Sequence, residues 1–191
     1  KVGVITEALK PRTFFQYFPR GLYNGMIAPI SNYPMTGVLW YQGESNVGRP
    51  DGYYELFKKL VSDWRASWQL GDFPFLFVQL ANLETGEDDH ESYWARLRDE
   101  QLKSLNVKNT AMAVTIDVGE ANDLHPQDKK SVGQRLAKGA QVLAYDQSIE
   151  YMGPIYESHV TTEDSIEINF SHTVTGLKVK GEEITGFVIA G

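Results

Sequence analysis

The stretch that decides the fold is Val38-Leu39-Trp40-Tyr41-Gln42-Gly43-Glu44-Ser45-Asn46. Its first four residues are apolar or aromatic, which predicts a short buried strand over Val38–Tyr41. Polar side chains follow at once around Gly43, a residue that lets the backbone turn tightly or approach a ligand. A turn needs one or two such side chains, whereas four here can form hydrogen bonds. We therefore interpret residues 42–46 as part of a functional site at the end of a strand.

Downstream of this stretch, helical and strand patterns alternate. Apolar residues recur at helical spacing from Tyr53 to Trp68, with Asp51 as the expected N-cap and Gly71 as the expected stop. Alternating helices and strands indicate parallel pairing with right-handed crossovers, so the sequence predicts an α/β fold, a three-layer sandwich with a parallel sheet. The other predicted elements are a buried strand at Phe73–Leu80, a helix at Ser92–Leu105, a strand at Ala111–Ile116 and a helix at Asp128–Tyr145.

A polar loop follows each of the three predicted strands. These loops are Gln42–Asn46, Asn82–His90 and Asp117–His125. Open parallel sheets bind ligands beyond the carboxyl ends of their strands. We therefore expect the three loops to converge on a common cleft.

The two ends of the chain differ from this central part. Val2–Ile5 is consistent with a strand, and Gly21–Ile30 with a short helix that Pro29 ends. We expect residues 1–149 to form part of an α/β domain and residues 150–191 to form a β-strand appendage. The alternating runs that predict strands in the appendage are Ser165–Phe170, Thr173–Val179 and Glu183–Ile189.

The composition is that of a globular protein with one main domain. The chain has 191 residues, enough to bury a core, and 42% of them are hydrophobic and 23% charged. Its net charge of −7 argues against a nucleic-acid partner, which would need clustered Lys and Arg. No apolar run approaches the ~20 residues of a membrane span. The absence of cysteine excludes disulfides, thiol catalysis and thiolate metal sites.

A histidine in the third loop is the main candidate for acid–base chemistry. His125 precedes Pro126 and a predicted helix, so we expect Pro126 at the first helical position and His125 at the cap. The positive end of that helix would disfavour the imidazolium and keep His125 neutral, as a general base requires. Asp123, two residues earlier, could hydrogen-bond the ring and orient it. The competing interpretation is a surface histidine beside an N-terminal Asp.

Three blocks of the sequence together resemble the sialate O-acetylesterase family of SGNH-type carbohydrate esterases. They are Trp40–Asn46 after a core strand, Leu22–Ile27 upstream, and Asp123-Leu124-His125-Pro126, which resembles the segment with the family's catalytic histidine. With the spacing between the blocks, the resemblance covers nearly the whole chain. It implies an SGNH or flavodoxin-like sandwich, serine-hydrolase chemistry without a cofactor or metal, and an O-acetylated carbohydrate as substrate.

Within that resemblance, His125 is the catalytic base and Asp123 the acid that orients it. The broader SGNH pattern is Asp-x-x-His, but the residue three before His125 is Asn122. Asp123 is therefore our first choice for the orienting acid. Asp117, Glu120 or a backbone carbonyl stay open as alternatives.

The same resemblance implies an oxyanion hole in the block after the first strand. Gln42 would be a side-chain donor, Gly43 would give close backbone approach, and Asn46 would be a second amide. Amides suit this role because they donate hydrogen bonds without carrying a charge. Ionised Glu44 cannot donate, so we expect it to position Gln42 or a loop; a polar strand exit is the competing interpretation. Arg98 is a candidate substrate contact, although a solvated arginine on a helix face is the simpler interpretation.

The nucleophilic serine of the family has no counterpart in this sequence. In the resembled family it lies well upstream of the Trp40 block, and Ser31 is in the wrong place for it. Ser45 only faintly matches the Gly-x-Ser-x-Gly elbow, because Val47 stands where the final glycine would be. We therefore expect the serine in a missing upstream segment or another chain, and no activity from this chain alone.

The resemblance also implies a substrate and a location. Sialic acid O-acetyl esters are the first expected substrates, and acetylxylan-type esters the second. Bacterial members that process carbohydrates are usually exported, which implies a periplasmic or secreted protein.

Two other classes of function stay open at this point. Oxygen and nitrogen ligands for a metal-dependent hydrolase are present in Glu44, Asp117, Asp123, His125 and His90, although no His-x-His or paired-carboxylate spacing occurs. A non-catalytic carbohydrate-binding protein fits the aromatic content but leaves Asp123 and His125 unexplained. A chelator would inhibit the metal hydrolase and leave the serine esterase unaffected.

Overall fold

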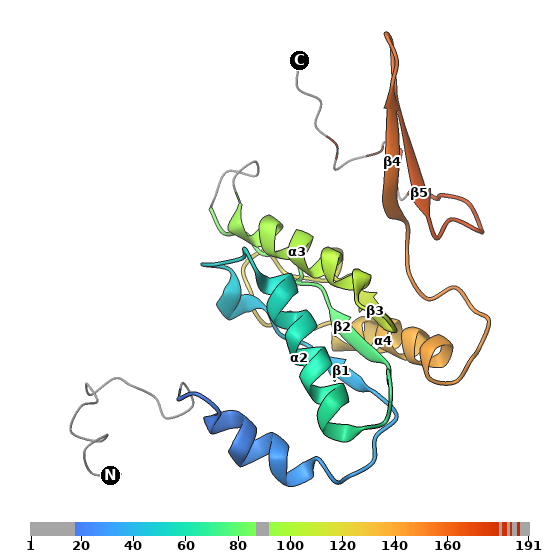
Figure 1. The fold of residues 1–191 in the computed structure, drawn as a ribbon. Helices are drawn as coiled ribbons and strands as arrows, with labels where there is room; N and C mark the ends of the chain where they lie inside the picture. Colours follow the sequence, from blue (N-terminus) through green and yellow to red (C-terminus); the bar gives the residue numbers. More distant parts are fainter. Residues whose placement is uncertain (1–17, 87–91, 180, 183, 185–186, 188–191) are drawn as a thin grey trace.

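The computed structural model describes residues 18–86, 92–179, 181, 182, 184 and 187, arranged as Figure 1 shows. Within these residues, the core is a parallel sheet of three strands in the order β1-β2-β3. The predicted α/β alternation and parallel pairing are confirmed. The strands are β1 (Val38–Trp40), β2 (Phe75–Val78) and β3 (Thr110–Ala113), and the helices that alternate with them are α2 (Tyr53–Trp68), α3 (Tyr93–Lys103) and α4 (Lys129–Leu143).

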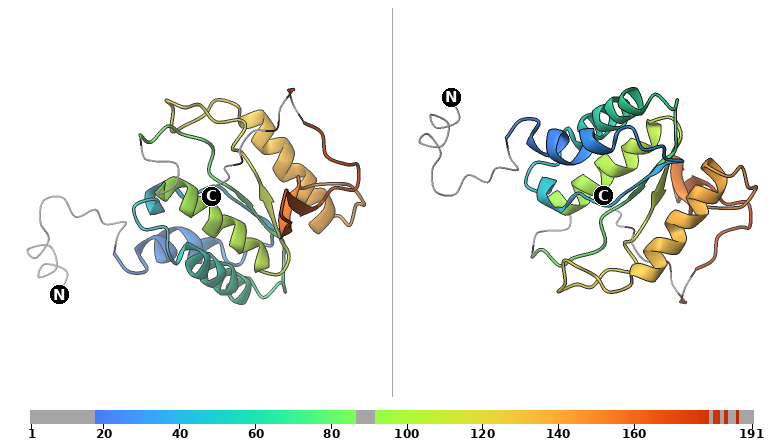
Figure 2. Two further views of the ribbon diagram at one scale, coloured as in Figure 1. Left: turned by 90° about the horizontal axis from the view of Figure 1, so that it is seen from above. Right: turned by 90° about the horizontal axis from the view of Figure 1, so that it is seen from below.

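The central strand β2 is buried on both faces because helices cover the sheet from two sides. Phe75 and Phe77 pack into the core formed with α2 and α3, whereas Leu76 and Val78 pack with α4. This alternation follows from the two-residue period of a strand, and it explains why the run of apolar residues is continuous. Figure 2 shows α2 and α3 on one side of the sheet and α4 on the other. The predicted three-layer sandwich is therefore confirmed.

The ends of α2 differ from the prediction. The N-cap is Gly52, whose φ of 88° lies in the left-handed region that favours glycine. Asp51, the predicted N-cap, instead pairs with Arg96 of α3, with 2.6 Å between Nη2 and Oδ1. At the other end, Gln69 adopts a φ of 54° and caps the helix before the predicted stop at Gly71 is reached.

The helix α4 lies within the predicted range Asp128–Tyr145, but its N-cap differs from the predicted one. Asp128 is the N-cap, and its carboxylate accepts hydrogen bonds from the backbone N–H of Ser131 at 3.0 Å and from its hydroxyl at 2.6 Å. A carboxylate is a strong cap for the first helical turn. Pro126 therefore lies before the helix, not at its first position, and His125 is not its cap. The prediction for these two residues was wrong, and the helix-dipole argument for a neutral His125 no longer applies.

The segment before β1 is helical, as predicted, but of irregular type. A π-helical turn at Tyr23–Ile27 leads into a 3-10 turn at Ala28–Ile30. Pro29 lies inside the 3-10 turn and does not end the helix, because a proline near the start of a turn removes no helical hydrogen bond. The strand predicted at Val2–Ile5 lies outside the described residues.

The residues after α4 lead to an antiparallel hairpin that extends away from the three layers (Figure 1). The hairpin pairs β4 (Ile155–Thr161) with β5 (Ile166–Ser171), and β5 matches the predicted run Ser165–Phe170. The predicted strand at Thr173–Val179 was wrong, because a turn with Gly176 at a φ of 81° interrupts it. The predicted strand at Glu183–Ile189 falls mostly outside the described residues, and the boundary after residue 149 stays a prediction.

Candidate functional site

The loops that follow the three strands line one pocket, called here the shared pocket, at the carboxyl edge of the sheet. Tyr41 and Glu44 come from the first loop, Asn82 from the second and Asp123 from the third. In addition, the Lys129 ammonium at the start of α4 lies 5.1 Å from the centre of the Tyr41 ring. The predicted convergence of the three loops is therefore present in the structure.

Hydrogen bonds within the first loop and from α2 fix the position of this loop. Gln42 Nε2 donates to Asn46 Oδ1 over 2.7 Å, and the backbone carbonyl of Gln42 accepts from the Tyr53 hydroxyl at 3.1 Å. Gln42 and Asn46 are half-buried and line a hollow against α2. Within residues 42–46, Glu44 is the residue that lines the shared pocket. The two predicted oxyanion amides thus face α2 in this structure.

A buried glutamine on α3 joins the first loop to the end of β2. Gln101 Oε1 accepts from the Leu80 N–H at 2.8 Å, and its Nε2 donates to the carbonyls of Gln42 and Val78, each at 3.3 Å. A Cβ at Gly43 would lie 2.9 Å from Gln101 Nε2, so this close approach requires glycine. Sequence reasoning missed Gln101. Its signal was a polar residue within the apolar stripe of a helix, which in a core needs hydrogen-bond partners.

Asp123 shapes the loop that carries His125. Its Oδ1 accepts from the backbone N–H of His125 at 2.7 Å, and its Oδ2 accepts from Gln127 Nε2 at 3.3 Å. These bonds, with the one to His125 first, lower the pKa of Asp123. Glu120 Oε1 adds a bond from the Gln127 N–H at 3.0 Å. Asp123 therefore fixes the backbone of His125, whose side chain is exposed; contact between Asp123 and the imidazole stays a prediction.

Asp117, one of the alternative orienting acids, is paired with α4. Its two carboxylate oxygens accept from the guanidinium of Arg135 at 2.6 and 2.7 Å. Arg135 also donates to the backbone carbonyl of Val114, and Asp117 raises the pKa of Arg135. This bidentate pair fixes the start of the third loop against α4. Asp117 is thus engaged with Arg135, whereas Asp123 and Glu120 accept hydrogen bonds from the backbone around His125.

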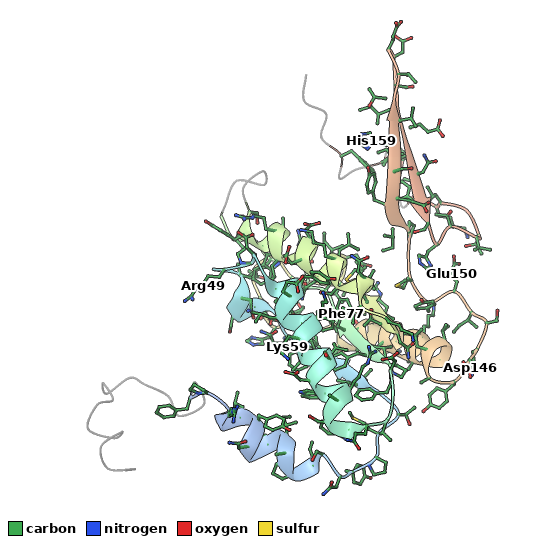
Figure 3. The ribbon with its side chains drawn as sticks, viewed as in Figure 1. Arg49, Lys59, Phe77, Asp146, Glu150 and His159 are labelled. Atoms are coloured by element: carbon green, nitrogen blue, oxygen red, sulfur yellow. The ribbon has the colours of Figure 1, made fainter. Side chains whose placement is uncertain are left out.

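The ligands predicted for a metal site are not gathered in the part of the chain that the structure describes. No group of three or more His, Asp or Glu side chains there is arranged to hold an ion. His90 lies outside the described residues. His159, labelled in Figure 3, lies on the distant hairpin, where its Nδ1 is 2.6 Å from the Tyr156 hydroxyl. A separate question is whether a helix could span a membrane. Among the described residues, no helix is both long enough and apolar enough to do so.

Arg98 and Ser45 occupy different environments. Arg98 is half-buried on α3, and burial lowers the pKa of its guanidinium. Its backbone carbonyl accepts from Gln79 Nε2 at 3.0 Å. Ser45 is exposed in a 3-10 turn at Glu44–Asn46. Neither residue lines the shared pocket, so a substrate contact for Arg98 stays a prediction.

Comparisons with known proteins place this site in context. The family model described as "Carbohydrate esterase, sialic acid-specific acetylesterase" matches residues 1–141. A sialate O-acetylesterase of Mus musculus is 36% identical over 152 residues, which is 70% of this chain and 28% of the relative. One of Homo sapiens is 34% identical over 154 residues, covering 71% of this chain and 29% of the relative. The chain thus spans less than a third of these relatives.

A solved structure gives the same picture for the fold. A carbohydrate acetylesterase from Xanthomonas citri superposes with a TM-score of 0.75 at 39% sequence identity. The match covers 78% of this chain and 35% of the other. Over 78% of its length, this chain therefore has a fold similar to part of that carbohydrate acetylesterase.

Proposed function

The chain belongs to the sialic acid-specific acetylesterase family of carbohydrate esterases, and from that membership we propose that the protein is a serine esterase that removes O-acetyl groups from carbohydrates. The observation that supports the proposal is the meeting of the loop of Glu44 with the loop of Asp123 at the shared pocket, a hollow of about 10 Å³ whose lining includes both neighbours of His125, Leu124 and Pro126, but not His125 itself. The same family membership supports an O-acetylated sugar as the substrate. We put O-acetylated sialic acids first and acetylxylan-type esters second.

In the proposed reaction, His125 moves the proton. Its imidazole accepts the proton of a serine hydroxyl while the serine oxygen attacks the acetyl carbonyl. The imidazolium then gives that proton to the departing sugar oxygen, which leaves acetyl-serine. The same imidazole deprotonates a water molecule that attacks the acetyl-serine, and the imidazolium then returns the proton to the departing serine oxygen, which releases acetic acid and restores the serine. Asp123 supports these steps by holding the backbone N–H of His125.

We assign stabilisation of the oxyanion to the first loop. Gln42 gives one N–H to Asn46 and has a second one available as a donor. The packing at Gly43 holds the loop against Gln101, so its backbone is fixed before substrate arrives. Each oxyanion donor that is lost costs about 3–4 kcal/mol of transition-state stabilisation. In this proposal Glu44 positions the loop, and Arg98 is a candidate substrate contact.

The nucleophilic serine is proposed to lie outside residues 1–191, in a preceding segment or a partner chain. Ser45 is exposed in the short turn Glu44–Asn46, beside the proposed oxyanion amide Asn46. We further propose that residues 1–149 are part of the catalytic domain and that residues 150–191 are a β appendage. The family match over residues 1–141 supports that division. An exported location, proposed from the family, is tested by cell fractionation.

Replacing His125 in the full-length protein tests the proposed function. We expect His125→Ala to lower kcat on an O-acetylated sialic acid by about 10²–10⁴-fold, because the general base is removed. His159→Ala is the matched control, since this histidine lies on the hairpin and bonds Tyr156; its kcat should match wild type. A chelator should leave the kcat of wild type and of His159→Ala unchanged. Wild-type turnover by His125→Ala would contradict the proposal.

A further inference from the structure

Asn82 carries a buried polar atom that the proposed mechanism does not use. The residue follows β2 and lines the shared pocket with Glu44 and Asp123. Its Oδ1 is buried, and in the described part of the chain it has no hydrogen-bond partner. A buried acceptor without a partner loses its hydration and gains nothing in return, so such atoms are rare in folded proteins. The side-chain oxygen of Asn82 therefore adds no hydrogen bond to the stability of the described fold.

The third loop packs against the oxygen of the Asn82 amide. A Cβ on Gly119 would overlap Asn82 Oδ1, so the amide oxygen is in close contact with this loop. Nδ2 makes no hydrogen bond to another described residue, and unlike Oδ1 it is accessible to solvent. Its two N–H donors thus lie on the accessible side. Both carboxylate oxygens of nearby Asp123 already accept bonds within the third loop.

Asn82 is also fixed relative to the loop of His125. The backbone N–H of Glu84 donates to the carbonyl of Ala121 at 2.8 Å, which ties the second loop to the third. Trp94 Nε1 donates to the carbonyl of Ala81 at 2.7 Å and anchors the residue before Asn82 to α3. A donor held in place on both sides loses little freedom on binding a ligand.

We propose that Asn82 contacts the substrate, with its side-chain amide donating a hydrogen bond to the carbonyl oxygen of the O-acetyl group. This inference rests on the proposed esterase function and adds a donor from the second loop. An ester carbonyl only accepts hydrogen bonds, and a neutral amide donates more strongly as negative charge develops on that oxygen. The amides of Gln42 and Asn46 line the hollow against α2 in this structure, so to share this role with Asn82 they have to turn toward the shared pocket.

Asn82→Leu in the full-length protein separates a substrate contact from structural support, because leucine has a similar volume and removes both the donor and the buried acceptor. We expect an unchanged or higher Tm, and kcat lower by about 10²-fold on an O-acetylated sialic acid and on an aryl acetate. KM should change by less than about threefold, since the bond strengthens in the transition state. Asn82→Asp, which cannot donate when ionised, should lose at least as much.

The control is Asn106→Leu, an exposed amide just before β3, at the opposite edge of the sheet; its kcat should equal wild type. Asn82→Leu with wild-type kcat would overturn the inference. So would a loss of kcat that comes with an equal fall of Tm in both Asn82 variants, because Asn82 would then be a structural support. If the wild-type protein hydrolyses neither ester, both the proposed esterase function and the role of Asn82 are contradicted. If wild type and Asn82→Leu are equally active, only the role of Asn82 is contradicted.

Discussion

At the scale of single residues, the site depends on polar groups that hold the backbone of loops. Asp123 accepts the N–H of His125, and Gln101 accepts the N–H of Leu80. Gly119 allows the third loop to approach Asn82. Each of these contacts fixes a segment next to the shared pocket. Replacing Asp123, Gln101 or Gly119 should therefore lower the stability of the fold or the order of that segment.

The carboxylate of Asp123 makes the third loop sensitive to acid. Its pKa is lowered chiefly by the bond from the His125 N–H, so the ionised form stabilises the fold at pH values above the unfolded pKa of about 4. That contribution is lost as the pH falls through the lower, folded pKa. We expect Asp123→Ala to have a lower Tm than wild type at pH 6, with the difference shrinking below about pH 4. Tm measured against pH checks this, with Asp63→Ala on α2 as an exposed control, and a difference that is constant with pH would contradict it.

A methyl group at Gly119 should destabilise the fold. The new Cβ would lie 2.5 Å from the backbone oxygen of Asn82 and 2.9 Å from the Cβ of Ala81, and backbone cannot move aside easily. We expect Gly119→Ala to lower the free energy of unfolding by about 1–3 kcal/mol in urea titrations. Gly133→Ala is the matched control, because nothing lies within 4 Å of the added Cβ in α4. It should gain about 0.5–1 kcal/mol from helix propensity, and equal effects at both sites would contradict the packing.

At the scale of elements, periodicity in the sequence predicted the strands and helices of the sandwich, but not the residues that cap the helices. Apolar spacing is a property of the segment itself, so β2 and α2 could be placed from their own residues. Which residue caps a helix depends on the other partners that its side chain can bind. Asp51 forms an ion pair with Arg96 of α3, and Asp128 accepts a hydrogen bond from the N–H of Ser131. These tertiary and local contacts decided the N-caps, Gly52 and Asp128 in place of the predicted Asp51 and His125.

The candidate site was predictable where it depends on local sequence, and not where it depends on contacts between distant segments. The polar loops and the block of Asp123 and His125 were visible because they interrupt apolar runs at strand ends. The orientation of Gln42 was not, because it depends on its bond to Asn46 and on the Tyr53 hydroxyl. The importance of Asn82 depends on its contact with Gly119, which is distant in sequence.

The link between α3 and the first loop can be tested at Gln101. Gln101→Leu leaves the N–H of Leu80 and the carbonyls of Gln42 and Val78 without this partner. We expect a loss of about 2–4 kcal/mol in the free energy of unfolding, because buried polar groups are left unsatisfied. Urea titration measures it. Gln141→Leu, on an exposed position of α4, should change stability by less than about 0.5 kcal/mol; similar values for both variants would contradict the role of Gln101.

At the scale of the whole molecule, three packed layers bring three loops to one edge of a sheet, while the C-terminal hairpin extends elsewhere. Phe77 lies in the core beneath α2 and α3, and His159 lies on the hairpin, as Figure 3 shows. We propose that this edge supplies the base and the oxyanion donors of a serine esterase. The serine itself is proposed to come from outside residues 1–191.

A phosphonate ester that reacts covalently with activated serines tests this division of labour most directly. In the full-length protein, we expect peptide mapping by mass spectrometry to place the label on a serine outside residues 1–191. We also expect His125→Ala to abolish labelling, because the serine is then no longer deprotonated. A label on Ser45, or full labelling of His125→Ala, would contradict the account.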